Sequence, residues 1–181
     1  MNSSLNTLNM LQRDEALVVL APLVENSPWV TEIVVDQRPF SSDETLAKAL
    51  VEVIIEARHE TRLALYNSHP ELSGAEAAEG RMTIESTFEQ ARLGLNSLSR
   101  AEALRLAELN QIYRARFDHP FILALHRVPD RKTLFEIFER RLNETPLEEH
   151  TSTLAEIASV IRARCRRTFG ASAKTSLEQL L

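Results

Sequence analysis

Apolar residues along this chain recur mostly three or four positions apart rather than at alternate positions. That spacing places apolar side chains on one side of an α-helix, whereas a strand with one buried face would alternate apolar and polar residues. Glycine, which weakens helices, occurs only four times in the 181 residues. We therefore predict an all-α fold, with a single compact multi-helix domain over residues 1–170 and a C-terminal tail over residues 171–181.

Capping residues and prolines predict where the helices begin and end. Ser41 and Ser99 each stand three residues before a glutamate, which is the capping-box pattern. Asp14 and Asp130 are expected to cap two further helices, and Pro28 suits the first turn of another. The predicted helices cover about residues 14–25, 28–37, 41–58, 63–68, 83–95, 99–119, 130–142 and 147–169.

A histidine directly before a proline, His69-Pro70, ends one of these helices. Proline disfavours helical backbone at the preceding residue, so we expect His69 at the helix exit. On the next long helix, Ser86, Glu89 and Gln90 share one side by their spacing. Histidine titrates near neutral pH, and a Glu/Gln pair can bind a polar ligand, so these segments predict a small-molecule site. Taken alone, the same residues also fit a helix cap and a solvated helix face.

Two segments between the predicted helices are expected to border this site. Residues 73–81 are small and polar with two glycines, which predicts a loop. The run 120–125 is too apolar to be exposed, and its pattern fits a buried strand and a buried loop equally.

Charge and cysteine content exclude several classes of function. The formal net charge is −5 and the basic residues are interspersed with acidic ones, so no basic stripe is available for nucleic acid. There is no run of eighteen apolar residues and no recognisable signal segment, so we expect no contact with a membrane. The single cysteine, Cys165, excludes an intramolecular disulfide and the histidines lack metal-ligand spacing, so we expect a cytoplasmic protein without a metal site.

Short motifs follow one another in a fixed order along nearly the whole chain. They are Ser27-Pro28-Trp29-Val30, Arg38-Pro39-Phe40, His69-Pro70 with Leu72, Glu85-Ser86 with Glu89-Gln90, Leu109-Asn110 with Tyr113 and Phe117, Pro120-Phe121-Ile122, Arg141-Leu142-Asn143 with Glu149, and Arg162-Ala163-Arg164. Together they resemble the 2-oxo-4-hydroxy-4-carboxy-5-ureidoimidazoline (OHCU) decarboxylase family, whose members complete the conversion of urate to (S)-allantoin. Asp118 and His126-Arg127 stand where that family often has glycine or a small residue, which is expected to alter the shape of the adjoining loop.

The resemblance implies an OHCU decarboxylase-like helical bundle and assigns roles to particular residues. His69 is implied as the catalytic acid/base, with Glu89 orienting the substrate and supporting the histidine electrostatically. The implied homodimer binds OHCU, a small molecule, and Arg164 is the implied cationic anchor for its carboxylate. The implied substrate-binding residues are Pro70, Ser86, Thr87, Phe88, Glu89, Gln90, Phe121, Ile122, Leu123, Ala124, Leu125 and Arg164.

The chemistry of OHCU explains why such residues would suffice. The carbon that bears the carboxylate lies next to a ring C=N bond, which can accept the electrons released with CO2. The reaction then needs only proton transfers, so neither pyridoxal, thiamine nor a metal is required, and no cofactor is expected. A histidine on one face of the ring can supply the proton stereospecifically.

Two other classes of function remain open from the sequence. The helices would also suit a non-catalytic interaction domain, in which the His-Pro motif only ends a helix. A different metal-free lyase or hydrolase acting on a related ureide could use the same His/Glu pair. Loss of activity in a His69 variant would argue against the first class, and a panel of ureide substrates would separate the second from a decarboxylase.

Overall fold

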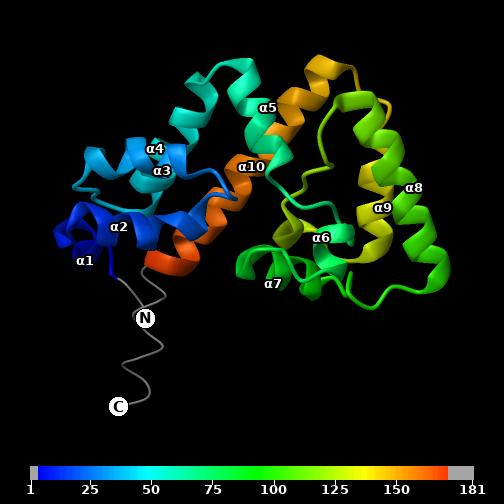
Figure 1. The fold of residues 1–181 in the computed structure, drawn as a ribbon, viewed down its shortest axis with the longest axis horizontal. Coiled ribbons are helices and arrows are strands. Elements are labelled where there is room, and N and C mark those ends of the chain that lie inside the picture. The colour runs from blue at the N-terminus through cyan, green and yellow to red at the C-terminus, as the bar shows by residue number, and fades with distance from the viewer. Residues whose placement is uncertain (1–3, 171–181) are drawn as a thin grey trace, which may run out of the picture. The chain divides into compact units, whose positions relative to one another are not determined.

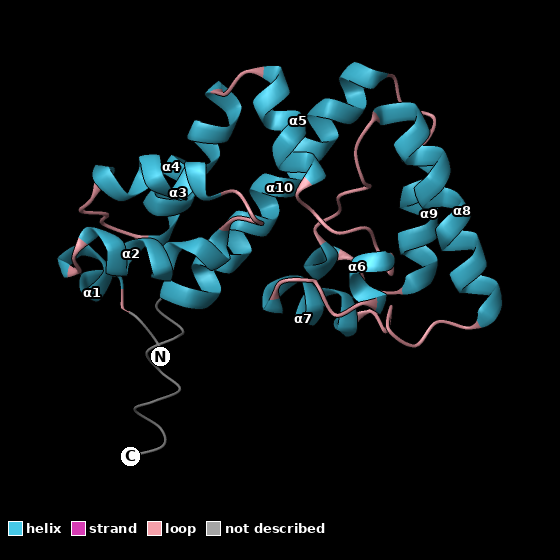
Figure 2. Ribbon diagram, viewed as in Figure 1, coloured by secondary structure: helices cyan, strands magenta, loops and turns pink. Residues whose placement is uncertain are grey.

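A computed structural model describes residues 4–170 of the chain. Over that range the chain forms helices joined by loops and turns, without a strand (Figure 2). The predicted all-α fold is therefore confirmed. The predicted tail, residues 171–181, lies outside the described residues. The domain boundaries stay a prediction; by their internal contacts, the described residues form two compact units, residues 4–62 with 158–170 and residues 63–157.

The first unit is built from short helices at the N-terminal end and the last turns of the final helix. Its elements are α1 (Leu5–Met10), α2 (Arg13–Leu20), η1 (Ala21–Leu23), α3 (Pro28–Val34), η2 (Val35–Gln37), α4 (Asp43–Glu56), the first residues of α5 (His59–Asn67) and the C-terminal part of α10 (Pro146–Phe169). In this unit α3 packs against α2 and α4. Leu8, Leu20, Val30, Val34 and Leu50 are completely buried, so the apolar spacing in the sequence does mark a core.

Two predicted helix starts in this unit are wrong. The second helix begins one residue earlier than Asp14, and the N–H of Gln12 donates to Glu15 Oε2 at 3.2 Å. The fourth helix is capped by Ser42 rather than Ser41, since the Thr45 N–H donates to Ser42 Oγ at 3.1 Å. For this fourth helix the cap depends on which of two adjacent serines leaves the helical backbone conformation, and their side-chain chemistry is the same.

The second unit holds the predicted site segments. Its complete elements are α6 (Ala75–Ala78), α7 (Ile84–Arg92), α8 (Arg100–Phe117), η3 (Leu125–Arg127) and α9 (Arg131–Arg141), with the end of α5 and the start of α10. The predicted caps Ser99 and Asp130 are confirmed, because they accept hydrogen bonds from the N–H groups of Glu102 and Thr133. Residues 73–81 are not loop throughout, since they include the single turn of α6.

The core of the second unit lies around α8 and α9, which run beside each other (Figure 1). Tyr113, Leu134 and Phe138 are completely buried there. The apolar run before η3 forms a loop, not a strand, and packs into this core. The rings of Phe121 and Phe138 are stacked with their centroids 3.8 Å apart. The side chains of this segment are apolar because they are buried in the core, although the backbone forms a loop and not a strand.

Asp118 ends α8 in the left-handed conformation, with a φ of 63°. A glycine adopts this conformation without strain, whereas in other residues the Cβ atom makes it less favourable. We expect Asp118→Gly to raise the free energy of unfolding by up to about 1 kcal/mol, measured by urea denaturation. Asp118→Val, with a β-branched side chain, is the contrasting variant and should lower it. Equal stability of the two variants would contradict this account.

Candidate active site

His69 lies just beyond the C-terminal end of α5 and is half-buried, as the following proline predicted. Its backbone N–H donates to the Tyr66 carbonyl at 3.1 Å. Its ring atom Nδ1 lies 2.9 Å from the Leu65 carbonyl oxygen. Because a carbonyl oxygen can only accept a hydrogen bond, Nδ1 carries a proton. In the neutral ring the basic lone pair is therefore on Nε2.

The end of α5 is anchored in the second unit by a buried tyrosine. Tyr66 has no exposed surface, and its hydroxyl lies 3.2 Å from His150 Nδ1 at the start of α10. Its ring contacts the ring of His119 edge-on, with centroids 5.0 Å apart. Burial lowers the pKa of His119, which favours the neutral ring in this contact. These contacts hold the two carbonyl groups that position His69.

The side chains of α7 face different environments. Ser86 and Gln90 are buried on one face, Glu89 is half-buried, and Thr87 and Phe88 are exposed. The helix is capped by Thr83, whose Oγ1 accepts a hydrogen bond from the Ser86 N–H at 3.2 Å. Of Ser86, Glu89 and Gln90, which were predicted to share one side, Ser86 and Gln90 lie on the buried face and Glu89 is half-buried.

Gln90 ties α7 to the turn that follows His69-Pro70. Its Oε1 accepts a hydrogen bond from the Ser73 N–H at 2.8 Å, and its Nε2 donates to the Glu71 carbonyl at 3.2 Å. One N–H of the side-chain amide donates to Glu71, and the Gln90 residue is only 5% exposed. Gln90 therefore fixes the distance between the histidine turn and α7.

Three charged side chains form hydrogen bonds with the backbone of the apolar segment from Phe121 to Leu125. Arg141 of α9 donates to the Ile122 carbonyl at 2.6 Å, and Glu156 of α10 accepts from the Ala124 N–H at 2.8 Å. Arg92 of α7 donates to the carbonyls of Leu125 and Val128. All five side chains of the segment are buried, so any polar contact that the segment makes with a ligand would come from its backbone.

Glu89 lies within electrostatic range of this segment's C-terminal end. Burial and the adjacent Arg127 guanidinium lower the pKa of His126, and the negative charge of Glu89 acts against this shift. The histidine turn, α7 and the 121–125 segment thus belong to one unit and are joined by named contacts.

Arg164, the expected carboxylate anchor, belongs to the first unit. It is buried, and its Nη1 donates to Glu25 Oε2 at 3.1 Å and to the Pro22 carbonyl at 3.3 Å. Glu25 is buried as well, so the pair is a desolvated ion pair. Within its unit, Arg164 therefore has a fixed position and a neutralising partner.

A sequence model of the OHCU decarboxylase family matches residues 9–166. The chain belongs to this family. It is 33% identical over 173 residues to OHCU decarboxylase of Mus musculus, covering 96% of this chain and 97% of the relative. It is 34% identical over 167 residues to OHCU decarboxylase of Haloferax volcanii, covering 92% of this chain and 96% of that one. The membership expected from the motifs is confirmed.

The fold is also similar to a solved structure, the crystal structure of (S)-allantoin synthase, with a TM-score of 0.72 and 23% sequence identity. The superposition covers 92% of this chain and 54% of that one, so the chain spans about half the length of that protein. The OHCU decarboxylase fold is therefore present over most of the chain.

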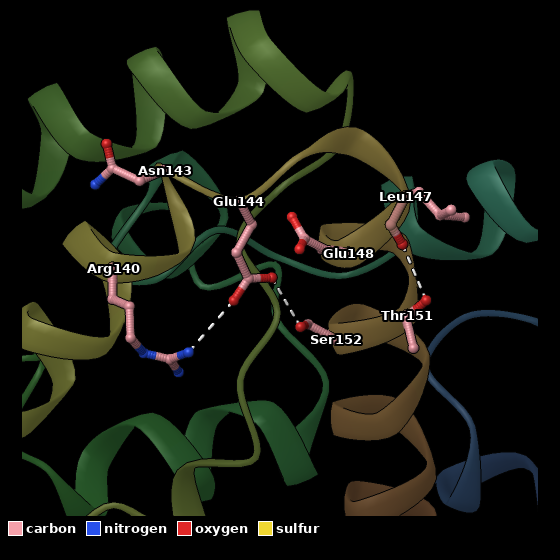
Figure 3. A pocket seen from close by; sticks show the side chains of 7 residues that line it. All are labelled: Arg140, Asn143, Glu144, Leu147, Glu148, Thr151 and Ser152. Carbon is pink, nitrogen blue, oxygen red and sulfur yellow. Dashed lines mark hydrogen bonds and ion pairs between the residues drawn. The ribbon is translucent and has the colours of Figure 1, made fainter.

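Two of the hollows in the second unit lie near the ends of its helices. One, of about 390 Å³, is bordered by α6, α7 and the start of α8, and of the predicted site residues only Thr87 and Gln90 line it. The other, of about 700 Å³, lies between the end of α9 and the start of α10. There Arg140 and Ser152 point toward Glu144 (Figure 3). It contains none of the residues predicted for the site.

A buried polar cluster was not predicted as part of the site. Arg141 and Glu149 form an ion pair that Thr153 joins at 3.0 and 2.8 Å, and the Tyr113 hydroxyl donates to Glu149. Burial raises the pKa of Tyr113, which keeps its hydroxyl protonated. Burial lowers the pKa of Arg141, but the hydrogen bond to Glu149 and the nearby negative charges together outweigh it, and the pKa is raised overall. In the sequence, the signal for this cluster was that Arg141 and Glu149 stand among the apolar residues of two helix faces.

Over residues 4–170, no helix combines the length and apolar character needed to cross a lipid bilayer. No group of three or more His, Cys, Asp or Glu side chains in the same range is arranged to bind a metal ion.

Proposed function

We propose that this protein converts OHCU to (S)-allantoin by decarboxylation and stereospecific protonation, in the degradation of urate and without a cofactor. Membership of the OHCU decarboxylase family supports the reaction and the substrate. The observation that carries the mechanism is the hydrogen bond from His69 Nδ1 to the Leu65 carbonyl. It assigns the basic lone pair of the neutral ring to Nε2, so that this atom exchanges protons with the substrate.

The first step is loss of CO2 from the carbon that also bears the hydroxyl group. The bonding electrons move into the adjacent ring C=N bond, whose nitrogen takes up a proton from solvent, and a neutral enol-like intermediate forms. In the second step the hydroxyl proton leaves, and the carbon that bears the ureido group gains a proton on one face. His69 accepts a proton at Nε2 and returns one from the same atom, so a fixed ring defines the face of protonation.

The other predicted residues bind and orient OHCU in this proposal. Glu89 accepts hydrogen bonds from ureido and ring N–H groups, and the second N–H of the Gln90 amide donates to a substrate carbonyl. The backbone of the 121–125 segment adds polar groups within an apolar wall, which excludes water and strengthens each polar contact. The proposed binding residues of the second unit are Pro70, Ser86–Gln90 and Phe121–Leu125. Arg164 stays a prediction as the carboxylate anchor, since within the first unit it is paired with Glu25.

We also infer a homodimer located in the cytoplasm. The resemblance to the family supports the dimer. The single Cys165 supports a reducing compartment, because it is a buried free thiol whose pKa burial raises to about 12. Sedimentation of the purified protein would measure its oligomeric state directly.

The direct test is a coupled stereochemical assay. Uricase and hydroxyisourate hydrolase generate OHCU from urate, and circular dichroism follows the allantoin that forms. Addition of this protein should produce a rapid rise of the (S)-allantoin signal. If the signal shows only the slow racemic background, the proposed function is wrong.

Glu89→Ala is expected to weaken both binding and rate in this assay. The variant loses the acceptor for the substrate N–H groups, and charged hydrogen bonds of this kind contribute roughly 1.5–3 kcal/mol, so kcat/KM should fall about 10- to 100-fold. Glu85→Gln is the matched control, because Glu85 lies one turn earlier on α7. Similar losses in both variants would instead indicate a general effect on α7.

A further inference from the structure

We propose that Arg114 of α8 is the residue that positions the catalytic turn, an inference that rests on the proposed function of His69. One planar guanidinium reaches both sides of the His69-Pro70 dipeptide. Its Nη1 donates to Asn67 Oδ1 at 3.0 Å, and its Nε donates to Glu71 Oε1 at 2.7 Å. Asn67 precedes His69 by two residues and Glu71 follows it by two. Arg114 therefore brackets the histidine without being part of the turn.

Two further hydrogen bonds join α8 to the chain around His69. Asn67 Nδ2 donates to the carbonyl of Asp118 at 2.9 Å, where α8 ends. Asn110, one helical turn before Arg114, donates from Nδ2 to the Leu72 carbonyl at 3.0 Å. Residues four apart lie on one face of a helix, so Asn110 and Arg114 present a single polar face to the turn. Hydrogen bonds to α8 thus hold the chain on both sides of His69.

The exposure of the Arg114–Glu71 ion pair indicates a role in positioning rather than in stability. The Arg114 side chain is 43% exposed and the Glu71 side chain 24% exposed. Ion pairs with this exposure contribute little to folding. Reacting groups, in contrast, must be held to within a fraction of an ångström, and small displacements of a catalytic group cost large factors in rate. Loss of Arg114 should therefore affect turnover more than the folded state.

The geometry also requires arginine and not merely a positive charge. The guanidinium offers donors in a fixed plane and uses two of them at once, toward Asn67 and Glu71. A lysine at this position has a single ammonium group and would hold only one side of the turn. Arg114→Lys should consequently show a defect between those of the wild type and Arg114→Gln.

The kinetic test compares Arg114 with an arginine on the same helix that does not contact the turn. Arg105 forms an ion pair with Glu139, with side chains 51% and 46% exposed, so Arg105→Gln is the matched control for Arg114→Gln. We expect Arg114→Gln to lower kcat about 10- to 100-fold and to change KM by less than about twofold. Arg105→Gln should leave both constants near the wild-type values, and the melting temperatures of the two variants should agree closely.

A spectroscopic test reports on His69 directly and needs no turnover. The ¹⁵N chemical shifts of the imidazole distinguish protonation at Nδ1 from protonation at Nε2. In the wild type we expect the neutral ring of His69 to carry its proton on Nδ1. Arg114→Gln should mix in the other tautomer, because the ring no longer stays aligned with the Leu65 carbonyl. Arg105→Gln should retain the wild-type spectrum.

The outcomes separate this inference from the proposed function. If the wild type produces (S)-allantoin rapidly but Arg114→Gln keeps its kcat and its His69 spectrum, Arg114 does not position the turn. If the wild type is inactive, the proposed function fails, and the His69 spectrum of Arg114→Gln alone decides whether Arg114 holds the ring. A fall in kcat that only parallels a fall in melting temperature would show a structural role and overturn the positioning proposal.

Discussion

His69→Asn is expected to lower kcat by about 10²- to 10⁴-fold while the protein stays folded. The asparagine side chain keeps an N–H group that can donate to the Leu65 carbonyl, as Nδ1 of the histidine does at 2.9 Å. It provides no group that titrates near neutral pH, so the proton exchange assigned to Nε2 is lost. The coupled assay measures the rate, and circular dichroism in the far ultraviolet measures the fold.

His59→Asn is the matched control for this change. His59 is an exposed histidine at the start of the same helix, α5, and is remote in sequence from the turn. It should keep nearly the wild-type kcat. Stereospecific turnover by His69→Asn at a rate close to that of His59→Asn would exclude His69 as the acid/base.

Glu149→Ala is expected to have the largest effect on stability, lowering the free energy of unfolding by about 3–5 kcal/mol. Glu149 has no exposed surface and accepts hydrogen bonds from Arg141, Tyr113 and Thr153. Its removal leaves the Arg141 guanidinium buried without its counter-charge, which is far less favourable than a paired charge. Urea denaturation followed by circular dichroism in the far ultraviolet measures the change.

Two further variants show whether the lost pairing is the cause. Glu139→Ala removes a glutamate from an exposed ion pair, with Arg105, and should cost less than about 1 kcal/mol. The double variant Arg141→Met/Glu149→Leu removes both buried charges and should recover part of the stability lost in Glu149→Ala. If Glu149→Ala is no less stable than Glu139→Ala, the buried pair does not have the role assigned to it.

Activity should also respond to Glu149→Ala at temperatures where the variant is folded. Arg141 donates to the Ile122 carbonyl at 2.6 Å, and its guanidinium lies 4.7 Å from the centre of the Phe121 ring. The ion pair therefore connects the stability of the core to the backbone of the proposed substrate wall. This connection explains why an arginine and a glutamate are buried where apolar residues would pack well.

Much of the fold could be predicted because helix signals are local. Ser99 and Asp130 cap helices as expected, since each contacts an N–H group only three residues away. The helix start predicted at Ser41 is wrong by one residue, because Ser42 is equally able to cap. The buried run 121–125 could not be assigned, since a loop that packs into a core is as apolar as a strand.

The candidate site could be predicted only in part. Pro70 placed His69 at a helix exit, and helical spacing placed Ser86 and Gln90 on one buried face. The sequence did not reveal that the Gln90 amide bonds to backbone groups of Glu71 and Ser73. Nor did it single out Arg114, because an arginine near the end of a helix ordinarily interacts with the helix dipole or with solvent.

By itself, then, the sequence determined the longer helices, the exit position of His69 and, through its ordered motifs, the family. The tertiary structure decided which side chains hold the turn of His69 and how the 121–125 segment is fixed. The physical reason is the range of the interactions. A cap or an apolar face involves residues three or four apart, whereas the hydrogen bond from Arg114 to Asn67 spans 47 positions and that from Arg141 to Ile122 spans 19. Such contacts exist only once α8 and α9 have packed beside the segments that they support.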